Sequence, residues 1–358
     1  MHEAFAPGGA LARTLPGFES RPEQAALADA VERSLASGEH LVAEAGTGTG
    51  KSLAYLIPSL ESGERVVVAT ATKALQTQLL EYDVPAAARA LGRKMNVEIL
   101  KGRANYVCRR QLSTFGQMLL REPRDEEAWE VIEPWLEETV TGDRAELPIE
   151  PSESLWAELA VGSDRCVGRR CALLSSCFAE AARQRASEAE LVIANHALYF
   201  ADIAADGGVL PEHGAVIFDE AHRLEETAAT WLGGRVSRHA IRRLTLDVER
   251  ACRDEKQQVP ARVLDRVELA TDRFLAAVTP PTGRRRLREP PIELVRPLVE
   301  ALADLNHALA GDGEGFETLG RRSLALAAAA EACLDPDTEG RVVWSEPDSV
   351  AWEIGRAH

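Results

Sequence analysis

The sequence predicts an α/β fold in which a parallel sheet is interrupted by two insertions. Three observations predict it. Apolar strands alternate with amphipathic helices over residues 20–100, the alternation stops near residue 101, and it resumes over residues 188–228. The chain has 358 residues, of which 45% are hydrophobic and 27% charged. That composition is sufficient for buried cores in about two domains.

The first part of the chain supplies the alternating elements. Ser20 precedes Pro22 and Glu23, a pattern typical of a capping box that opens a helix. The apolar periodicity then predicts, in order, a strand at 40–44, a helix at 51–60, a strand at 65–70, a helix at 73–80 and an extended segment at 97–100. Strands are expected again at 191–194 and 216–218. Their β-branched runs are typical of buried parallel strands.

We expect two insertions in this α/β domain. The predicted segments are 1–100 for its first part, 101–187 for a cysteine-bearing insertion, 188–228 for its second part, 229–345 for a mostly helical insertion, and 346–358 for a return towards the α/β domain. Residues 121–153 carry twelve acidic and three basic side chains, so this stretch should repel phosphate. Residues 279–291 are rich in proline and arginine and are expected to form a loop.

Charge and hydropathy limit the class of protein. The net charge of −16 excludes a protein that coats nucleic acid by bulk positive charge, although local basic patches remain compatible with it. No apolar run approaches the roughly 20 residues of a membrane-spanning helix, and the N-terminus lacks a signal-peptide pattern. We therefore expect a cytosolic protein with reduced cysteines and no membrane partner.

Residues 45–52, AGTGTGKS, form a glycine-rich turn between a predicted strand and a predicted helix. Glycines allow backbone N–H groups to point at phosphate oxygens at the positive end of the helix. Lys51 is expected to reach the β- and γ-phosphates of ATP, and the Ser52 hydroxyl to bind Mg²⁺. The other ATP-binding residues predicted in the turn are Ala45, Gly46, Thr47, Gly48, Thr49 and Gly50. The alternative is a glycine-rich turn with an exposed lysine.

Residues 215–222, AVIFDEAH, place two carboxylates after an apolar strand. Open parallel sheets bind ligands at the carboxyl ends of their strands. We expect Asp219 to hold Mg²⁺ and Glu220 to orient or deprotonate the attacking water. Lys51, Asp219 and Glu220 are therefore the predicted catalytic residues, and an ordinary acidic turn is the alternative.

Four of the six cysteines lie between these two motifs: Cys108, Cys166, Cys171 and Cys177. Four thiolates can hold a [4Fe–4S] cluster or a structural zinc ion. Zinc modules typically use two tight cysteine pairs, whereas the last three cysteines here follow a looser C-x4-C-x5-C spacing. Spacing alone leaves both metals open, with four unrelated thiols as the third alternative. Cys252 and Cys333 have no partners in the pattern.

Taken together, the motifs resemble superfamily 2 helicases. Gly46–Ser52 is similar to motif I, Asp219–His222 to motif II and Ala69–Gln78 to motif Ia. The narrower resemblance is to the iron–sulfur group known as XPD/Rad3–DinG, because residues 101–108 and 194–198 are similar to the segments on either side of that group's cluster cysteines. The resemblance covers residues 15–228 closely.

This resemblance implies a P-loop NTPase (RecA-like) motor domain with an inserted iron–sulfur domain and an inserted helical arch. It implies an ATP-driven DNA helicase of repair or replication that moves 5′→3′ on single-stranded or forked DNA. The implied cofactors are ATP, Mg²⁺ and a [4Fe–4S] cluster, and the implied form is a nucleoid-associated monomer. It adds as ATP-binding residues Arg21, Gln24 and His222. It adds as DNA-binding residues Thr72, Arg103, Asn105, Tyr106 and Arg109.

In these helicases a second motor domain follows the arch, and this sequence carries no such domain. We therefore expect an N-terminal part of a longer helicase that binds ATP weakly and hydrolyses it poorly. Two alternatives remain. One is a metal-dependent single-strand-binding module in which ATP is only a structural ligand, and the other is a P-loop ATPase whose cysteines hold zinc.

Overall fold

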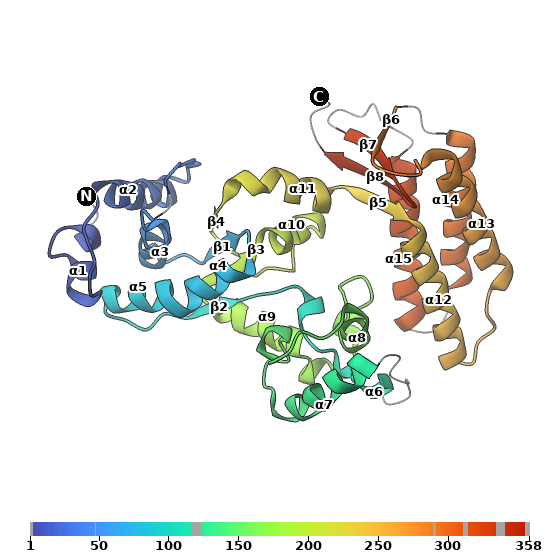
Figure 1. The fold of residues 1–358 in the computed structure, drawn as a ribbon, viewed down its shortest axis with the longest axis horizontal. Coiled ribbons are helices and arrows are strands. Elements are labelled where there is room, and N and C mark those ends of the chain that lie inside the picture. Colours follow the sequence, from blue (N-terminus) through green and yellow to red (C-terminus); the bar gives the residue numbers. More distant parts are fainter. Residues whose placement is uncertain are drawn as a thin grey trace. The chain divides into compact units, whose positions relative to one another are not determined.

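The computed structural model describes residues 3–46, 48–115, 123–288, 291–310, 314–333 and 341–354 (Figure 1). The chain divides into two compact units. The first comprises Met1–Asn105, Leu136–Glu146 and Phe178–Leu224, and the second comprises Tyr106–Trp135, Leu147–Cys177 and Glu225–His358. All four predicted metal-binding cysteines therefore belong to the second unit.

The first unit is built on a four-stranded parallel sheet of strand order β2-β3-β1-β4. The strands are β1 (Val66–Thr70), β2 (Val97–Ile99), β3 (Leu191–Asn195) and β4 (Ala215–Phe218). Val66 is in register with Leu191 on one side and with Ala215 on the other, so the carboxyl ends of three strands meet at one edge. Every residue of β1 is buried, which accounts for its three consecutive valines.

Helices surround this sheet (Figure 1). They are α1 (Ala10–Thr14), α2 (Pro22–Ser37), α3 (Lys51–Glu61), α4 (Lys73–Gln78), α5 (Val84–Leu91), α9 (Phe178–Glu188) and α10 (His196–Ala204), with a π-helical turn at Leu79–Asp83. Leu53, Leu56 and Ile57 of α3 pack with Val68 and Ile193 of the sheet in one core. The phosphate-loop helix is thereby anchored to the strands.

The second unit combines helices with an antiparallel sheet of order β5-β8-β7-β6. Its C-terminal elements are α11 (Leu224–Leu232), β5 (Gly234–Ser237), α12 (Arg238–Asp254), α13 (Ala261–Val278), β6 (Arg285–Leu287), α14 (Ile292–Ala308), α15 (Glu314–Ala332), β7 (Arg341–Glu346) and β8 (Ser349–Ile354). Helices α12 to α15 lie side by side and share one core with the sheet (Figure 1).

Helices and 3₁₀ turns are described in the cysteine-bearing part of the chain. They include α6 (Arg109–Phe115), α7 (Pro123–Glu138), α8 (Glu153–Leu159) and the 3₁₀ turns at Gly168–Arg170 and Leu174–Ser176. An isolated antiparallel bridge joins Val107 to Ala160. Among the described helices, none combines the length with the apolar character that crossing a bilayer requires.

The predicted parallel α/β sheet is confirmed, and three local expectations are wrong. Residues 40–44 form no strand, and Val42 in that segment is 98% exposed. The prediction failed because periodicity alone does not assign so short an apolar run. Ser20 does not cap α2. Its hydroxyl donates to the Phe5 carbonyl, and Arg21 occupies the cap position. The loop predicted at 279–291 contains a short strand, Arg285–Leu287, which pairs with β7.

Candidate functional site

The glycine-rich turn leads directly into α3, which begins at Lys51. Gly50 has a φ of 76°, in the left-handed region, and a Cβ at this position would collide with the amide of Gln24. Gln24 Nε2 donates to the Gly50 carbonyl at 2.9 Å, and the Arg21 guanidinium donates to the Gly48 carbonyl. Arg21 and Gln24, which were predicted to bind ATP, therefore also hold the backbone of the loop.

The remaining loop residues shape the turn itself. The Thr49 hydroxyl donates to the Gly46 carbonyl at 2.9 Å, and Ala45 is half-buried before the turn. Thr47, also predicted to bind ATP, lies outside the described residues. The turn presents its exposed glycines at the N-terminus of α3, where backbone N–H groups favour an anion.

The carboxyl end of β4 meets this helix. Lys51 Nζ lies 3.3 Å from Glu220 Oε1, although 169 residues separate them in the chain. Glu220 has a φ of 57°, so its backbone turns sharply after the strand. His222 is exposed, and its Nδ1 lies 3.4 Å from Glu220 Oε2. The ammonium and the second carboxylate of the predicted catalytic set are thus in contact.

Asp219 is buried at the same edge, with 8% of its surface exposed. Its Oδ1 accepts the backbone N–H of Glu220 at 2.9 Å, and its Oδ2 accepts the hydroxyl of Tyr55 at 3.0 Å. The Ser52 hydroxyl interacts with Tyr55 and with Asp83. Hydroxyl and carboxylate oxygens are the hard ligands that Mg²⁺ prefers, so Ser52 and Asp219 fit the ion together with phosphate and water.

A buried histidine connects the ends of three strands. His196, at the start of α10, is 2% exposed, and its Nε2 lies 2.9 Å from the Asp219 carbonyl and 3.2 Å from the Ala69 carbonyl. Since both partners are acceptors, the Nε2 atom carries the proton. Burial lowers the pKa of His196, so the ring is neutral. This residue fixes the backbone on which Asp219 and Glu220 stand.

Replacing His196 with leucine is expected to lower the free energy of unfolding by about 1–3 kcal/mol, because two buried carbonyls lose a donor. Glutamine, which retains an N–H donor, should restore part of the loss. Urea denaturation followed by circular dichroism measures both. His40→Leu, at an exposed histidine of the same unit, is the control and should change the free energy by no more than about 0.5 kcal/mol. An unfolding free energy of His196→Leu equal to that of the parent contradicts the expectation.

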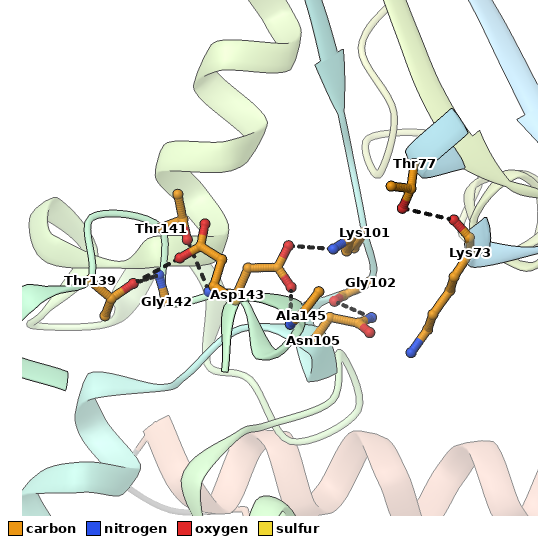
Figure 2. Close-up of polar contacts among 11 residues, drawn as sticks. Lys73, Thr77, Lys101, Gly102, Asn105, Thr139, Thr141, Gly142, Asp143 and Ala145 are labelled. Carbon is orange, nitrogen blue, oxygen red and sulfur yellow. Dashed lines mark hydrogen bonds and ion pairs between the residues drawn. The ribbon is translucent and has the colours of Figure 1, made fainter. Parts of the chain in front are cut away.

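The predicted DNA-binding residues make contacts within the protein, and Figure 2 shows that of Asn105. The Arg103 guanidinium pairs with Glu180 at 3.2 Å, and the Asn105 amide donates to the Gly102 carbonyl at 3.0 Å. Figure 2 also shows Lys101, just before these residues, pointing at the carboxylate of Asp143. Tyr106 is 3% exposed, so its ring presents little surface to a base.

Two further predicted DNA contacts lie at element ends. The Thr72 hydroxyl accepts the Leu75 N–H at 3.3 Å and caps α4, and Arg109 Nε donates to the Ser176 carbonyl at 2.8 Å. Arg109 is exposed at the start of α6. The DNA-binding role of all five residues remains a prediction.

The four cysteines between the motifs are unbridged and half-buried. Burial raises the pKa of the Cys108 thiol, and the nearby Cys166 raises it further. Nearby backbone N–H groups and the charge of Arg110 offset part of this increase. Gly168 N–H points at Cys166 Sγ at 3.4 Å. Within the part of the chain that the structure describes, no three His, Cys, Asp or Glu side chains converge as metal ligands. The four thiols are suitable metal ligands, but among the described residues they are not arranged around a common metal position.

Sequence reasoning missed Tyr55, Asp83 and the role of His196. Tyr55 offered a signal, since a tyrosine on an otherwise apolar helix face needs a partner for its hydroxyl. Asp83 offered none, because a π-helical turn brings it to Ser52, and no local pattern predicts such a turn.

Residues 21–124 match the DEAD/DEAH box helicase family, a segment that includes the glycine-rich turn and motif Ia. The matched segment ends well before the acidic end of β4, so the family model covers the glycine-rich turn but not the residues that face it.

Among known proteins, the chain is homologous to the helicases YoaA and DinG. It is 35% identical over 300 residues to ATP-dependent DNA helicase YoaA of Escherichia coli (strain K12), an alignment that covers 81% of this chain and 47% of that protein. It is 36% identical over 299 residues to ATP-dependent helicase DinG of Mycobacterium tuberculosis (strain ATCC 25177 / H37Ra), covering 75% and 43%. A solved XPD helicase structure superposes with a TM-score of 0.49 and 16% identity, covering 94% of this chain and 54% of that one. The chain spans about half the length of the curated relatives it matches.

Proposed function

We propose that the chain forms the ATP-binding part of an ATP-dependent DNA helicase. The observation that carries the proposal is the contact of Lys51 with Glu220, which joins the phosphate loop to the acidic end of β4. The names of the YoaA and DinG relatives support ATP as the fuel, and the YoaA name supports DNA as the substrate.

The arrangement accounts for the chemistry of the ATP site. When ATP binds, Lys51 exchanges Glu220 for the phosphates. Ser52 and Asp219 would hold Mg²⁺, which would neutralise phosphate charge. Release from Lys51 leaves the Glu220 carboxylate available to orient the attacking water. The loop contacts of Arg21 and Gln24 keep the N–H groups directed at the phosphates.

We further propose that the cysteine-bearing part holds a [4Fe–4S] cluster through Cys108, Cys166, Cys171 and Cys177. The half-buried thiols, and the N–H group directed at Cys166 Sγ, support ligation. Zinc is the competing metal. On this proposal, residues 101–187 act as an iron–sulfur insertion and residues 229–345 as a helical arch.

Single-stranded or forked DNA is the proposed substrate, with a cytoplasmic monomer as the acting form. The candidates for DNA contact are Thr72, Arg103, Asn105, Tyr106 and Arg109. The exposed Arg109 supports a phosphate contact most directly. The 5′→3′ direction remains an expectation from the resemblance.

Turnover separates this helicase function from a binding module that uses ATP only structurally. We expect slow hydrolysis of ATP that rises when single-stranded DNA is added, and we expect Glu220→Gln to abolish turnover while DNA binding persists. Phosphate release and fluorescence anisotropy of a labelled oligonucleotide measure the two properties. A parent that binds both DNA and ATP without any turnover favours the binding module.

A further inference from the structure

A tyrosine outside the predicted machinery touches the carboxylate proposed to hold magnesium. Tyr55 lies on α3, one turn after Ser52, and is 5% exposed. Its hydroxyl donates to Asp219 Oδ2 at 3.0 Å. A buried tyrosine needs a hydrogen-bond partner for its hydroxyl, and here the partner is the Asp219 carboxylate.

This hydrogen bond completes the support of the Asp219 carboxylate. The other oxygen, Oδ1, accepts the Glu220 N–H at 2.9 Å. Two donors from different elements fix the rotation of the carboxylate plane. Because each carboxylate oxygen has about two acceptor sites, each retains one for Mg²⁺ or for a water bound to it.

The tyrosine remains a donor under ordinary conditions. Its hydroxyl faces the Asp219 carboxylate, which can only accept, so the phenol is the donor. The hydrogen bond to the carboxylate is charge-assisted.

The second proposed magnesium ligand belongs to the same network. The Ser52 hydroxyl interacts with Tyr55 and with Asp83, and Gln78 Nε2 donates to Asp83 Oδ2 at 3.3 Å. Asp83 ends the π-helical turn Leu79–Asp83, which follows α4. Single π-helical turns are rare and concentrate at functional sites.

We propose that Tyr55 is a positioning residue that orients Asp219 and Ser52 for Mg²⁺. The proposal rests on the ATP site proposed above and adds to it a residue that acts through the ligands rather than on the nucleotide. Outer partners of metal ligands typically change metal affinity by about 10- to 100-fold when removed.

The test compares Tyr55→Phe with the parent in the 358-residue chain. A fluorescent ATP analogue is titrated in EDTA, and Mg²⁺ is then titrated at fixed nucleotide. We expect the Mg²⁺ concentration at half-saturation to rise about tenfold, while nucleotide affinity in EDTA is unchanged. Tyr82→Phe, which removes the hydroxyl of a tyrosine that is 68% exposed, is the matched control and should behave as the parent.

An Asp219→Asn background tests whether Tyr55 acts through the carboxylate. There, adding Tyr55→Phe should leave the Mg²⁺ midpoint unchanged, whereas a role in general folding would lower affinity again and overturn the proposal. A parent that binds nucleotide without any effect of Mg²⁺ refutes the proposed ATP site. A Mg²⁺-dependent parent with an unaltered Tyr55→Phe midpoint refutes the positioning role alone. If Tyr55→Phe fails to fold, the proposal is overturned as well, because the hydroxyl is then required for the stability of the fold.

Discussion

Replacing Lys51 with alanine is expected to weaken Mg·ATP binding by about 10- to 100-fold. The loop glycines and the N-terminus of α3 remain, but a charge-assisted contact with the phosphates is lost, and such contacts contribute about 1.5–3 kcal/mol each. Equilibrium binding of a fluorescent ATP analogue in Mg²⁺ measures the loss.

The partner of Lys51 should respond in the opposite direction. Lys51 must leave Glu220 before it reaches a phosphate, and this pair is partly exposed, with 29% and 40% of the two side chains accessible. Solvent-screened pairs contribute about 0.2–1 kcal/mol, so Glu220→Gln should tighten nucleotide binding by up to about fivefold while it abolishes hydrolysis. Weaker nucleotide binding by Lys51→Ala together with tighter binding by Glu220→Gln would show that the carboxylate and the phosphates compete for the Lys51 ammonium.

Lys94→Ala is the matched control, since it removes an exposed lysine from the same unit. Its affinity should equal that of the parent. If Lys51→Ala binds as tightly as Lys94→Ala, the turn is only an exposed glycine-rich loop, and the assignment of the phosphate site fails. If Glu220→Gln weakens binding, the ion pair supports the site rather than competing with the nucleotide.

The parallel sheet could be predicted because its strands carry their own signal. Strands β1 and β3 are continuous apolar runs, and the structure buries all of β1 and most of β3. The position of Asp219 follows from a general rule, since it stands at the carboxyl end of a parallel strand, whereas Lys51 could be placed from the glycine-rich turn that opens α3. A local pattern together with fold geometry was therefore sufficient for this half of the site.

Contacts between distant segments escaped prediction. Two basic residues that precede Cys108 meet carboxylates far away in sequence, since Lys101 pairs with Asp143 and Arg103 with Glu180. Charge composition shows only that partners exist. The strand at 40–44 failed for a related reason, because whether a short apolar run joins a sheet depends on the edge available to it.

The antiparallel sheet of the second unit shows the same limit. Strand β6 has three residues, all of them in an arginine-rich stretch that carries no strand period. It is held by pairing with β7, about 60 residues later in the chain, where Arg285 is in register with Ser345. Such a strand is stabilised by its partner and not by its own propensity.

Serine substitution of any one of Cys108, Cys166, Cys171 and Cys177 is expected to lower the bound iron by about tenfold or more in anaerobically purified protein. Residues 161–177, all of which the structure describes, bury only Val161 and Val167, so the segment has little core of its own. Metal ligation would supply much of its folding energy. Iron and sulfide analysis, with the visible absorption spectrum, measures the change, and the segment should become more sensitive to proteolysis.

Cys252→Ala and Cys333→Ala are the controls, because both thiols are buried in the core of the second unit. They should reduce stability through lost packing and leave the iron content unchanged, whereas the four serine variants should lose iron whatever their stability. Zinc in place of iron and sulfide would assign the site to a structural zinc ion. Iron that survives all four single substitutions would show that these thiols are not its ligands, since a cluster held by four cysteines cannot keep its full occupancy after losing each in turn.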